Sequence, residues 1–352
     1  MMKIPLSRQE GRQAGATCHA PAIAKMDQTT EQILRRRMHG LYLSRKCEDI
    51  AQLSHELLGL HCWFHRNVAF SALIRGAGLA GWKRKLTKTW VHHALHGVVY
   101  EDLPTLLALN SGEWRWGEPY KEIADQVIRL MEDGVYSRAE MRVILADAYD
   151  RQTLDRALSP WGGVFCELAR LGKVAFRDMT SRDFDLIDAE PTQTFEEVLP
   201  ELFRGYLSAY APATLTDAAW FFGLTKDRKK SLYALNLDEY GRFEYNKNTY
   251  YFIDDRTDMG DIPELTLLSG FDPLIVSYAE RGAALPPEYK KAVVMKSGIC
   301  LPTIAVNGQV AGLWNIKNRE PMVEFFTEQP QRIRHAAYGL VEWIRWQTAG
   351  IL

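Results

Sequence analysis

The order of helical and strand-like segments, which occurs twice in succession, constrains the fold of this chain most. Helical spacing of apolar residues covers 120–134, 137–149 and a third segment broken around Pro160–Gly163, and the β-like runs "VAFRD" and "FDLID" follow. The same order returns in "FEEVLPELFRGYLSAY", "TLTDAAWFFGL" and "TKDRKKSLYAL", followed by "GRFEYNKNTYYFID" with a hairpin turn at 246–248. Three helices and a two-stranded wing are typical of a winged helix, and the later set predicts a helix–turn–helix. The alternative is a helix pair that serves only packing.

The flanking segments extend this scheme at both ends. Residues 29–58 predict two helices, and "NVAFSALIRG" predicts a third helix that ends at Gly76. From 263 to 317 the pattern is β-like, with a hairpin at Asn307–Gly308, and "PQRIRHAAYGLVEWIRW" predicts a closing helix. We therefore predict a mainly α fold with β structure, made of three tandem winged-helix units and a C-terminal small β-barrel or sheet. The expected boundaries are a disordered leader at 1–28, winged-helix units at 29–118, 119–192 and 193–258, and a β-barrel-like subdomain with its closing helix at 259–352.

The charge distribution is uneven, although the formal net charge is only −1. Residues 33–90 carry eleven basic and three acidic side chains, a net charge of +8, which leaves −9 for the rest of the chain. Such asymmetry favours a polyanionic partner, and a phosphate backbone is the commonest one. A solvated helical face explains the same charges equally well.

Composition argues against several other classes of protein. Every uninterrupted apolar run is shorter than the roughly 18 residues of a transmembrane helix, and the polar start of the chain does not resemble a secretory signal. The five cysteines are scattered and odd in number, which argues against a disulfide framework and favours a reducing cytoplasm. We expect a cytoplasmic protein, associated with the nucleoid in a bacterium, that has no membrane partner and no evident protein partner.

Two histidine clusters indicate a candidate chemical centre. "GLHCWFHRNVAF" contains His61 and His65 with Cys62 between them, and "HHALH" contains His92 and His96. On a helix, each i, i+4 pair would lie on one face, which is a typical zinc spacing. No glutamate lies within either pair as in the zinc-protease motif. The open alternatives are a metal site, a metal-free catalytic centre, and buried histidines that bond to backbone carbonyls.

Four short blocks, in the same order, resemble the AlkZ/YcaQ-type winged-helix DNA glycosylases. They are "TWVHHALHGVVYEDLP", "GYLSAYAPATLTDAAWFFGL", "LTLLSGFDPLIVSYAER" and "VNGQVAGLWNIK". The residues that carry the likeness are Trp90, Leu95, His96, Asp102, Leu103, Pro104, Tyr210, Pro212, Ala213, Thr214, Asp217, Leu267, Leu268, Phe271, Asp272, Pro273, Arg281, Gly308, Gly312 and Trp314. The resemblance covers about 30–345 of the chain. It implies a protein that curves around duplex DNA and hydrolyses the N-glycosidic bond of alkylated or crosslinked bases, in repair or self-protection.

The expected catalytic region departs from that family pattern. The family carries Gln-x-Gln or Gln-x-Asp where this chain has His61-Cys62-Trp63, so the resemblance puts His61 at the first catalytic position and Trp63 at the second. An imidazole can hold or deprotonate the attacking water, whereas an indole offers only a donor. We expect His61 to act as general base or to position water, with His96, the family's ordinary histidine, beside it. The alternatives are a non-catalytic DNA-binding paralogue in which Trp63 blocks the chemistry and, third, a metal-dependent hydrolase.

Basic side chains on the first and third units are expected to contact phosphates. They are Arg35, Arg36, Arg37, Arg66, Lys83, Arg84, Lys85, Lys88, Lys226, Arg228, Lys229 and Lys230. The "YNKNTYY" wing is expected to touch the minor groove, and base flipping is optional for a bulky lesion. The predicted partner is therefore double-stranded DNA, and no cofactor or metal is expected.

Overall fold

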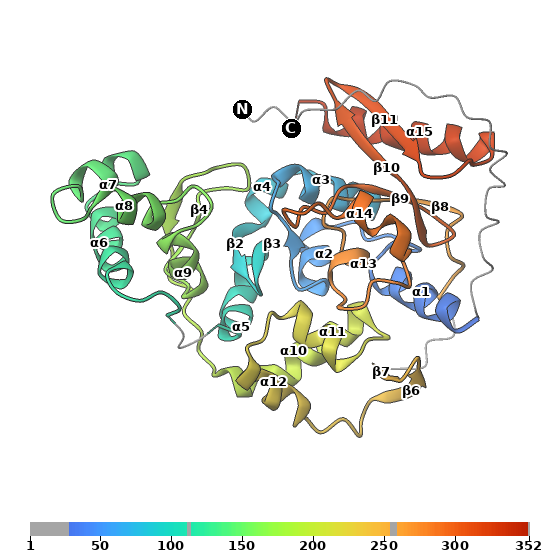
Figure 1. Ribbon diagram of the computed structural model, residues 1–352, viewed down its shortest axis with the longest axis horizontal. Helices are drawn as coiled ribbons and strands as arrows, with labels where there is room; N and C mark the ends of the chain where they lie inside the picture. The colour runs from blue at the N-terminus through green and yellow to red at the C-terminus, as the bar shows by residue number, and fades with distance from the viewer. Residues whose placement is uncertain (1–27, 111–113, 254–258, 351–352) are drawn as a thin grey trace.

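The computed structural model describes residues 28–110, 114–253 and 259–350 (Figure 1). The expected leader therefore lies outside the described residues, apart from Gln28. The chain is a mixed α/β protein with several small antiparallel sheets. Among the described helices, none combines the length and the apolar character that a membrane span requires.

The first part of the chain packs helices around a three-stranded sheet. Its elements are α1 (Gln28–Gly40), α2 (Ile50–Glu56), β1 (Leu60–His61), α3 (His65–Ile74), α4 (Trp82–Lys85), β2 (Thr87–Val91) and β3 (Ala94–Val98). The two helices predicted over 29–58 correspond to α1 and α2, and the helix predicted over 67–76 corresponds to α3. Asp49 caps α2, since its carboxylate accepts hydrogen bonds from the first backbone N–H groups of that helix. The sheet has the order β1-β3-β2, and both pairings are antiparallel.

The second part forms a group of helices with a short hairpin, at the left of Figure 1. It follows η1 (Tyr100–Asp102) and α5 (Leu103–Ala108) and comprises α6 (Tyr120–Glu132), α7 (Arg138–Ile144), α8 (Arg151–Ala157), α9 (Val164–Arg170), β4 (Val174–Phe176) and β5 (Phe184–Leu186). Ser137 caps α7, because its hydroxyl accepts the backbone N–H of Glu140. The predicted break around Pro160–Gly163 separates α8 from α9, and β4 pairs with β5.

The third part repeats the order of helices and hairpin. Its elements are α10 (Phe195–Tyr210), α11 (Leu215–Phe221), α12 (Lys226–Tyr233), β6 (Gly241–Tyr245) and β7 (Asn248–Phe252). Thr214 caps α11 in a capping box with Asp217. The β6–β7 turn falls on Asn246 and Lys247, whose φ angles of 49° and 63° suit a two-residue hairpin.

The C-terminal part differs in detail from the expected β pattern. Its elements are β8 (Leu265–Leu268), α13 (Pro273–Val276), η2 (Pro287–Tyr289), α14 (Lys290–Val293), β9 (Thr303–Val306), β10 (Gln309–Lys317), β11 (Glu320–Phe325) and α15 (Gln331–Thr348). Two segments expected as β are helical: α13 begins because Asp272 accepts the N–H of Leu274 and Pro273 suits a first helical position, and α14 is the other. The described strands form an open sheet, in the order β11-β10-β9-β8, and not a closed barrel.

The sequence blocks behind the resemblance hold this architecture together. Gly312 lets β11 approach β10, because a Cβ there would overlap the carbonyl of Glu324. The indole N–H of Trp314 donates to the carbonyl of Leu268 at 2.9 Å. Arg75 and Asp272 form an ion pair at 2.9 Å in which both side chains are 0% exposed. Further hydrogen bonds satisfy both charges, as a buried pair requires.

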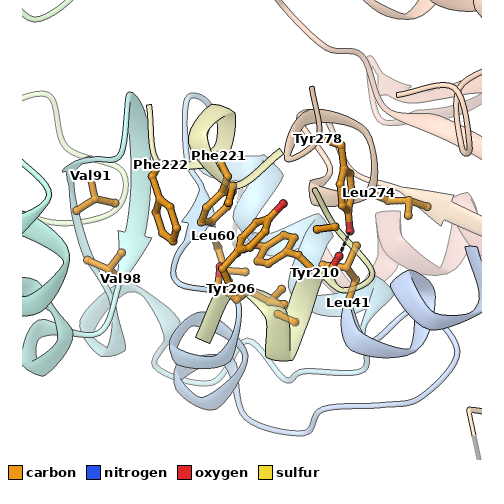
Figure 2. Packing of buried hydrophobic residues seen from close by; sticks show 14 of the residues in the cluster. Leu41, Leu60, Val91, Val98, Tyr206, Tyr210, Phe221, Phe222, Leu274 and Tyr278 are labelled. Atoms are coloured by element: carbon orange, nitrogen blue, oxygen red, sulfur yellow. Dashed lines mark hydrogen bonds between the residues drawn. The ribbon is translucent and has the colours of Figure 1, made fainter. Parts of the chain in front are cut away.

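Four hydrophobic clusters lie inside the described chain, and the two largest meet at the β2–β3 hairpin. The main core joins the first and third parts, and Figure 2 shows its aromatic centre, in which the Tyr278 hydroxyl donates to the Tyr210 carbonyl at 3.0 Å. The second core belongs to α6–α9 and the β4–β5 hairpin. The β2–β3 hairpin serves both: Trp90 lies in the second core and Val91 in the main core, because successive strand residues point to opposite faces.

Candidate functional site

The three-stranded sheet, not a helix, positions the central histidines. His61 lies on β1 opposite His96 on β3, which in turn lies opposite Thr89 on β2. Residues directly opposite in antiparallel strands project from the same face, so His61 and His96 are neighbours across the sheet. His92 sits in the β2–β3 turn with φ 55°. The expectation that His61/His65 and His92/His96 share helix faces is therefore wrong: His61 lies on β1 whereas His65 begins α3, and His92 lies in a turn whereas His96 lies on β3.

The imidazole rings form a contiguous row that ends against a phenyl ring. The His61 and His96 ring centroids are 5.2 Å apart, and so are those of His96 and His92. Phe271 stacks on His61 at 4.3 Å, with 3° between the planes. Phe271 adopts a left-handed φ of 56°, an uncommon conformation for a bulky residue and one that clusters at functional sites.

Backbone carbonyls fix the tautomers of two of these rings. Nε2 of His92 donates to the carbonyl of Leu58 at 2.9 Å, and Nδ1 of His96 donates to that of Ala94 at 3.1 Å. A carbonyl only accepts, so each of these nitrogens carries the proton and the other nitrogen of each neutral ring is an acceptor. Nδ1 of His61 is buried without a hydrogen-bond partner in the described structure, although the residue keeps some exposed surface.

Burial holds the row in its neutral form. It lowers the pKa of His61 and of His92 well below the ordinary value of 6.5, and the neighbouring His96 lowers both further. Burial also lowers the pKa of His96 to about 4. These rings are therefore uncharged at neutral pH and can accept from or donate to a water molecule.

The metal interpretation finds no ligand set here. Within 28–110, 114–253 and 259–350, no group of three or more His, Cys, Asp or Glu is placed to hold a metal ion. His65 begins α3, and burial lowers its pKa with help from Lys88, Lys83 and Arg66. The four described cysteines are free.

Trp63, expected at the second catalytic position, is engaged with another indole. It stacks on Trp161, with centroids 6.4 Å apart and 8° between planes, and packs against the second core. Trp161 lies in the turn between α8 and α9 and is 73% exposed. Sequence reasoning missed Trp161, for which "SPWGG" gave only a helix break, and missed Phe271 as a neighbour of His61.

Asn67 is a polar residue near His61 that sequence reasoning also missed. It is buried on α3, its amide packs against Gly270, and its Nδ2 has no hydrogen-bond partner in the described structure. Gly270 precedes Phe271, so this amide lies close to the phenyl ring that covers His61. Because Asn67 lies at the start of an apolar helical run, the neighbouring residues gave no indication that its amide would lie near His61.

Two of the twelve basic residues expected on DNA are inside the protein. Arg37 is 3% exposed, donates to the carbonyl of Pro212, and lies 3.7 Å from the Asp217 carboxylate. Lys88 is buried, donates to the carbonyl of Ser181, and lies over the Phe176 ring. Neither side chain reaches a phosphate from these positions, which corrects the expectation for both.

The other basic residues retain exposed surface. Arg66, Lys83, Arg84 and Lys85 are exposed on α3 and α4, where Lys85 also pairs with the Asp49 carboxylate. On α12, Lys226, Lys229 and Lys230 are exposed, Lys230 pairs with Asp227 at 2.7 Å, and Arg228 lies over the Phe195 ring. On α1, Arg35 pairs with Glu31 and Asp261, and Arg36 lies over the Phe252 ring.

Comparison with known proteins decides the family. The sequence model of the family described as "DNA glycosylase AlkZ-like" matches residues 78–332, well over half of the chain. The chain belongs to the AlkZ-like DNA glycosylase family. The expected family and class of enzyme are thereby confirmed.

One sequence comparison and one structural comparison, both with Streptomyces sahachiroi, give the extent of the likeness. A relative named "Interstrand DNA cross-link repair glycosylase" is 22% identical over 275 residues, which are 69% of this chain and 74% of the relative. The structure described as "Streptomyces sahachiroi DNA glycosylase AlkZ" superposes with a TM-score of 0.72 at 22% identity, over 90% of this chain and 96% of that one. At this identity the structural likeness shows a shared fold.

The AlkZ-like match covers the sheet only in part. The matched range includes His96 and Phe271 but begins after His61 and Trp63. The catalytic positions assigned to His61 and Trp63 therefore stay a prediction.

Proposed function

We propose that this AlkZ-like chain is a monofunctional DNA glycosylase that hydrolyses the N-glycosidic bond of alkylated or crosslinked bases in duplex DNA. Family membership supports the class of reaction, and the name of the Streptomyces sahachiroi relative supports a crosslinked base as one substrate. The observation that carries the catalytic assignment is the pairing of two neutral imidazoles, His61 and His96, on one face of the sheet.

The chemistry asks for one well-placed water molecule. In the proposed step the C1′–N bond breaks with its electron pair going to the base, the water oxygen bonds to C1′, and the water proton passes through the imidazole of His61 to solvent. A neutral ring near an oxocarbenium-like carbon avoids the repulsion that an imidazolium would cause. The low pKa of His61 makes it a weak base, so orientation of the water is its larger contribution.

DNA contact is proposed to come from three tandem winged-helix units with the boundaries predicted above. The support is the recurring order of helices followed by an antiparallel hairpin: β2–β3, β4–β5 and β6–β7. Near His61, the exposed Arg66 and Lys83 can neutralise phosphates. They adjoin the N-terminus of α3, which has no side-chain cap and carries the positive end of the helix dipole. In the third unit, α12 presents exposed lysines.

The test is excision from a duplex that contains 7-methylguanine, detected as strand scission after alkaline treatment. Wild type should produce scission, and His61→Ala should lower its rate by about a hundredfold or more. His335→Ala is the matched control, because His335 is exposed on α15. Scission that is unaffected by His61→Ala would remove His61 from the mechanism.

A non-catalytic DNA-binding paralogue is the second candidate, and one observation favours it. Trp63 offers no acceptor, and its ring is already stacked on Trp161. This reading expects duplex binding without scission of 7-methylguanine DNA or of crosslinked DNA.

A further inference from the structure

Trp161 presents an open aromatic face beside the candidate site. One face of its ring stacks on Trp63 in an offset arrangement, while 73% of the residue remains exposed. A large exposed aromatic side chain indicates a binding surface more strongly than an exposed aliphatic one, because exposing so much apolar surface to water costs free energy. The geometry of the pair leaves room for one more planar group on the free face of Trp161.

The turn that carries Trp161 is rigidly built. The Ser159 hydroxyl accepts the backbone N–H of Trp161 at 3.2 Å, and the Ser159 carbonyl accepts that of Gly162 at 3.1 Å. Gly163 has φ 58°, and a Cβ there would overlap the carbonyl of Ala157, so only glycine suits this position. The turn therefore fixes the backbone at Trp161, and the stack on Trp63 orients the indole before any ligand binds, which lowers the entropic cost of binding.

Trp63 ties this aromatic pair to the catalytic strand. It follows His61 by two residues, so their Cα atoms lie within about 7 Å of each other. Trp63 packs on the core of α6–α9 while His61 packs on Phe271. The pair therefore borders His61 on the side of the second group of helices.

We propose that Trp161, supported by Trp63, is a positioning residue that stacks on a nucleobase unpaired at the lesion. The inference rests on the proposed function, since it requires damaged DNA at His61. Every nucleobase has a π-face, so such a contact is tolerant of sequence and replaces stacking that the duplex loses at the lesion. The indole at position 63 thereby serves as the support of Trp161 where the family carries a polar side chain.

Binding to a duplex that already lacks the base tests the proposal without chemistry. The probe is a duplex with a tetrahydrofuran abasic-site analogue and 2-aminopurine opposite it, compared with an undamaged duplex. Wild type should bind the abasic duplex more tightly than the undamaged one and should quench the fluorescence of 2-aminopurine by stacking on it. Trp161→Ala should lower that preference about tenfold or more and leave 2-aminopurine unquenched. Trp161→Phe should retain most of the preference and most of the quenching.

The matched control is Trp346→Ala, which removes another exposed indole (65% exposed) from α15, at the other end of the molecule from α8 (Figure 1). It should behave as wild type, and all three variants should keep the wild-type Tm. Equal preference and equal quenching for Trp161→Ala and Trp346→Ala would overturn the proposal. The proposal would also be overturned if Trp161→Ala changed the apparent molecular mass on gel filtration but left DNA binding unchanged. That result would assign the indole to a protein contact.

The binding experiment and the excision experiment distinguish failure of the stacking role from failure of the proposed reaction. If wild type excises neither 7-methylguanine nor a crosslinked base but Trp161→Ala still loses its preference for the abasic duplex, the glycosylase proposal fails and the stacking role stands. If excision proceeds and Trp161→Ala keeps the preference, the stacking role alone fails.

Discussion

Acidification should destabilise this protein through its buried histidines, and His96 sets a lower limit on the size of the effect. His96 is 8% exposed, and burial lowers its pKa to about 4, against 6.5 for a free histidine. Between these two values the unfolded chain binds the proton and the folded chain does not. Stability is therefore fully present above about pH 6.5 and is lost as the pH falls toward the folded pKa.

The magnitude follows from the two pKa values. At pH 5 the unfolded imidazole is almost fully protonated while the folded one is almost neutral, so His96 alone removes about 2 kcal/mol between pH 7.5 and pH 5. His61 and His92 act with the same sign, because burial lowers their pKa values too. The total loss should therefore exceed that of His96.

Urea denaturation at pH 7.5, 6.5, 5.5 and 5.0 measures this dependence. His96→Gln should begin from a lower free energy of unfolding but lose about 2 kcal/mol less than wild type over the series. His335→Gln, an exposed change on α15, should parallel wild type. If His96→Gln and wild type show the same pH dependence, His96 is not a neutral buried group, and the uncharged row described above is wrong.

Three further outcomes are expected. The excision rate should stay flat from pH 8 to pH 6.5 and fall only in more acidic solution, because burial lowers the pKa of His61; single-turnover rates across that range test this, and a midpoint at 6.5 would contradict it. Asp272→Asn should lower the free energy of unfolding by about 3–5 kcal/mol in urea denaturation, because it strands the Arg75 charge in the core; an effect below about 1 kcal/mol would contradict the buried pair. Lys83→Ala should weaken duplex binding regardless of sequence and reduce the slope of log K against log salt by about 1, and an unchanged slope would remove Lys83 from the phosphate contacts.

Local sequence signals predicted most of the elements. Caps such as Ser137 and Thr214, and the turn at Asn246–Lys247, act within a few residues, so the sequence states them directly. The helices of the third part were likewise expected close to their observed bounds. The β pattern failed at 273–276, where the Asp272 cap outweighs the preference of Ile and Val for strands.

The candidate site was predicted less well, because long-range pairing builds it. The i, i+4 spacing of His61 and His65 fits a helix, yet β1 forms by pairing with β3, a contact that no local pattern specifies. Phe271 reaches His61 from 210 positions further along the chain. The basic count of the first unit likewise gave no sign that Arg37 and Arg75 meet their carboxylates in the interior.

The two-sided hairpin β2–β3 limits how the modules of this protein can be exchanged. Trp90 and Leu95 complete the hydrophobic interior of the neighbouring helical group, while Val91 and Val98 complete the other interior. A chimera that takes 119–192 from a relative must therefore inherit matching residues on alternate positions of a strand pair that lies outside the transplanted segment. Because His96 belongs to the same pair, recombination between relatives is constrained at the proposed catalytic site.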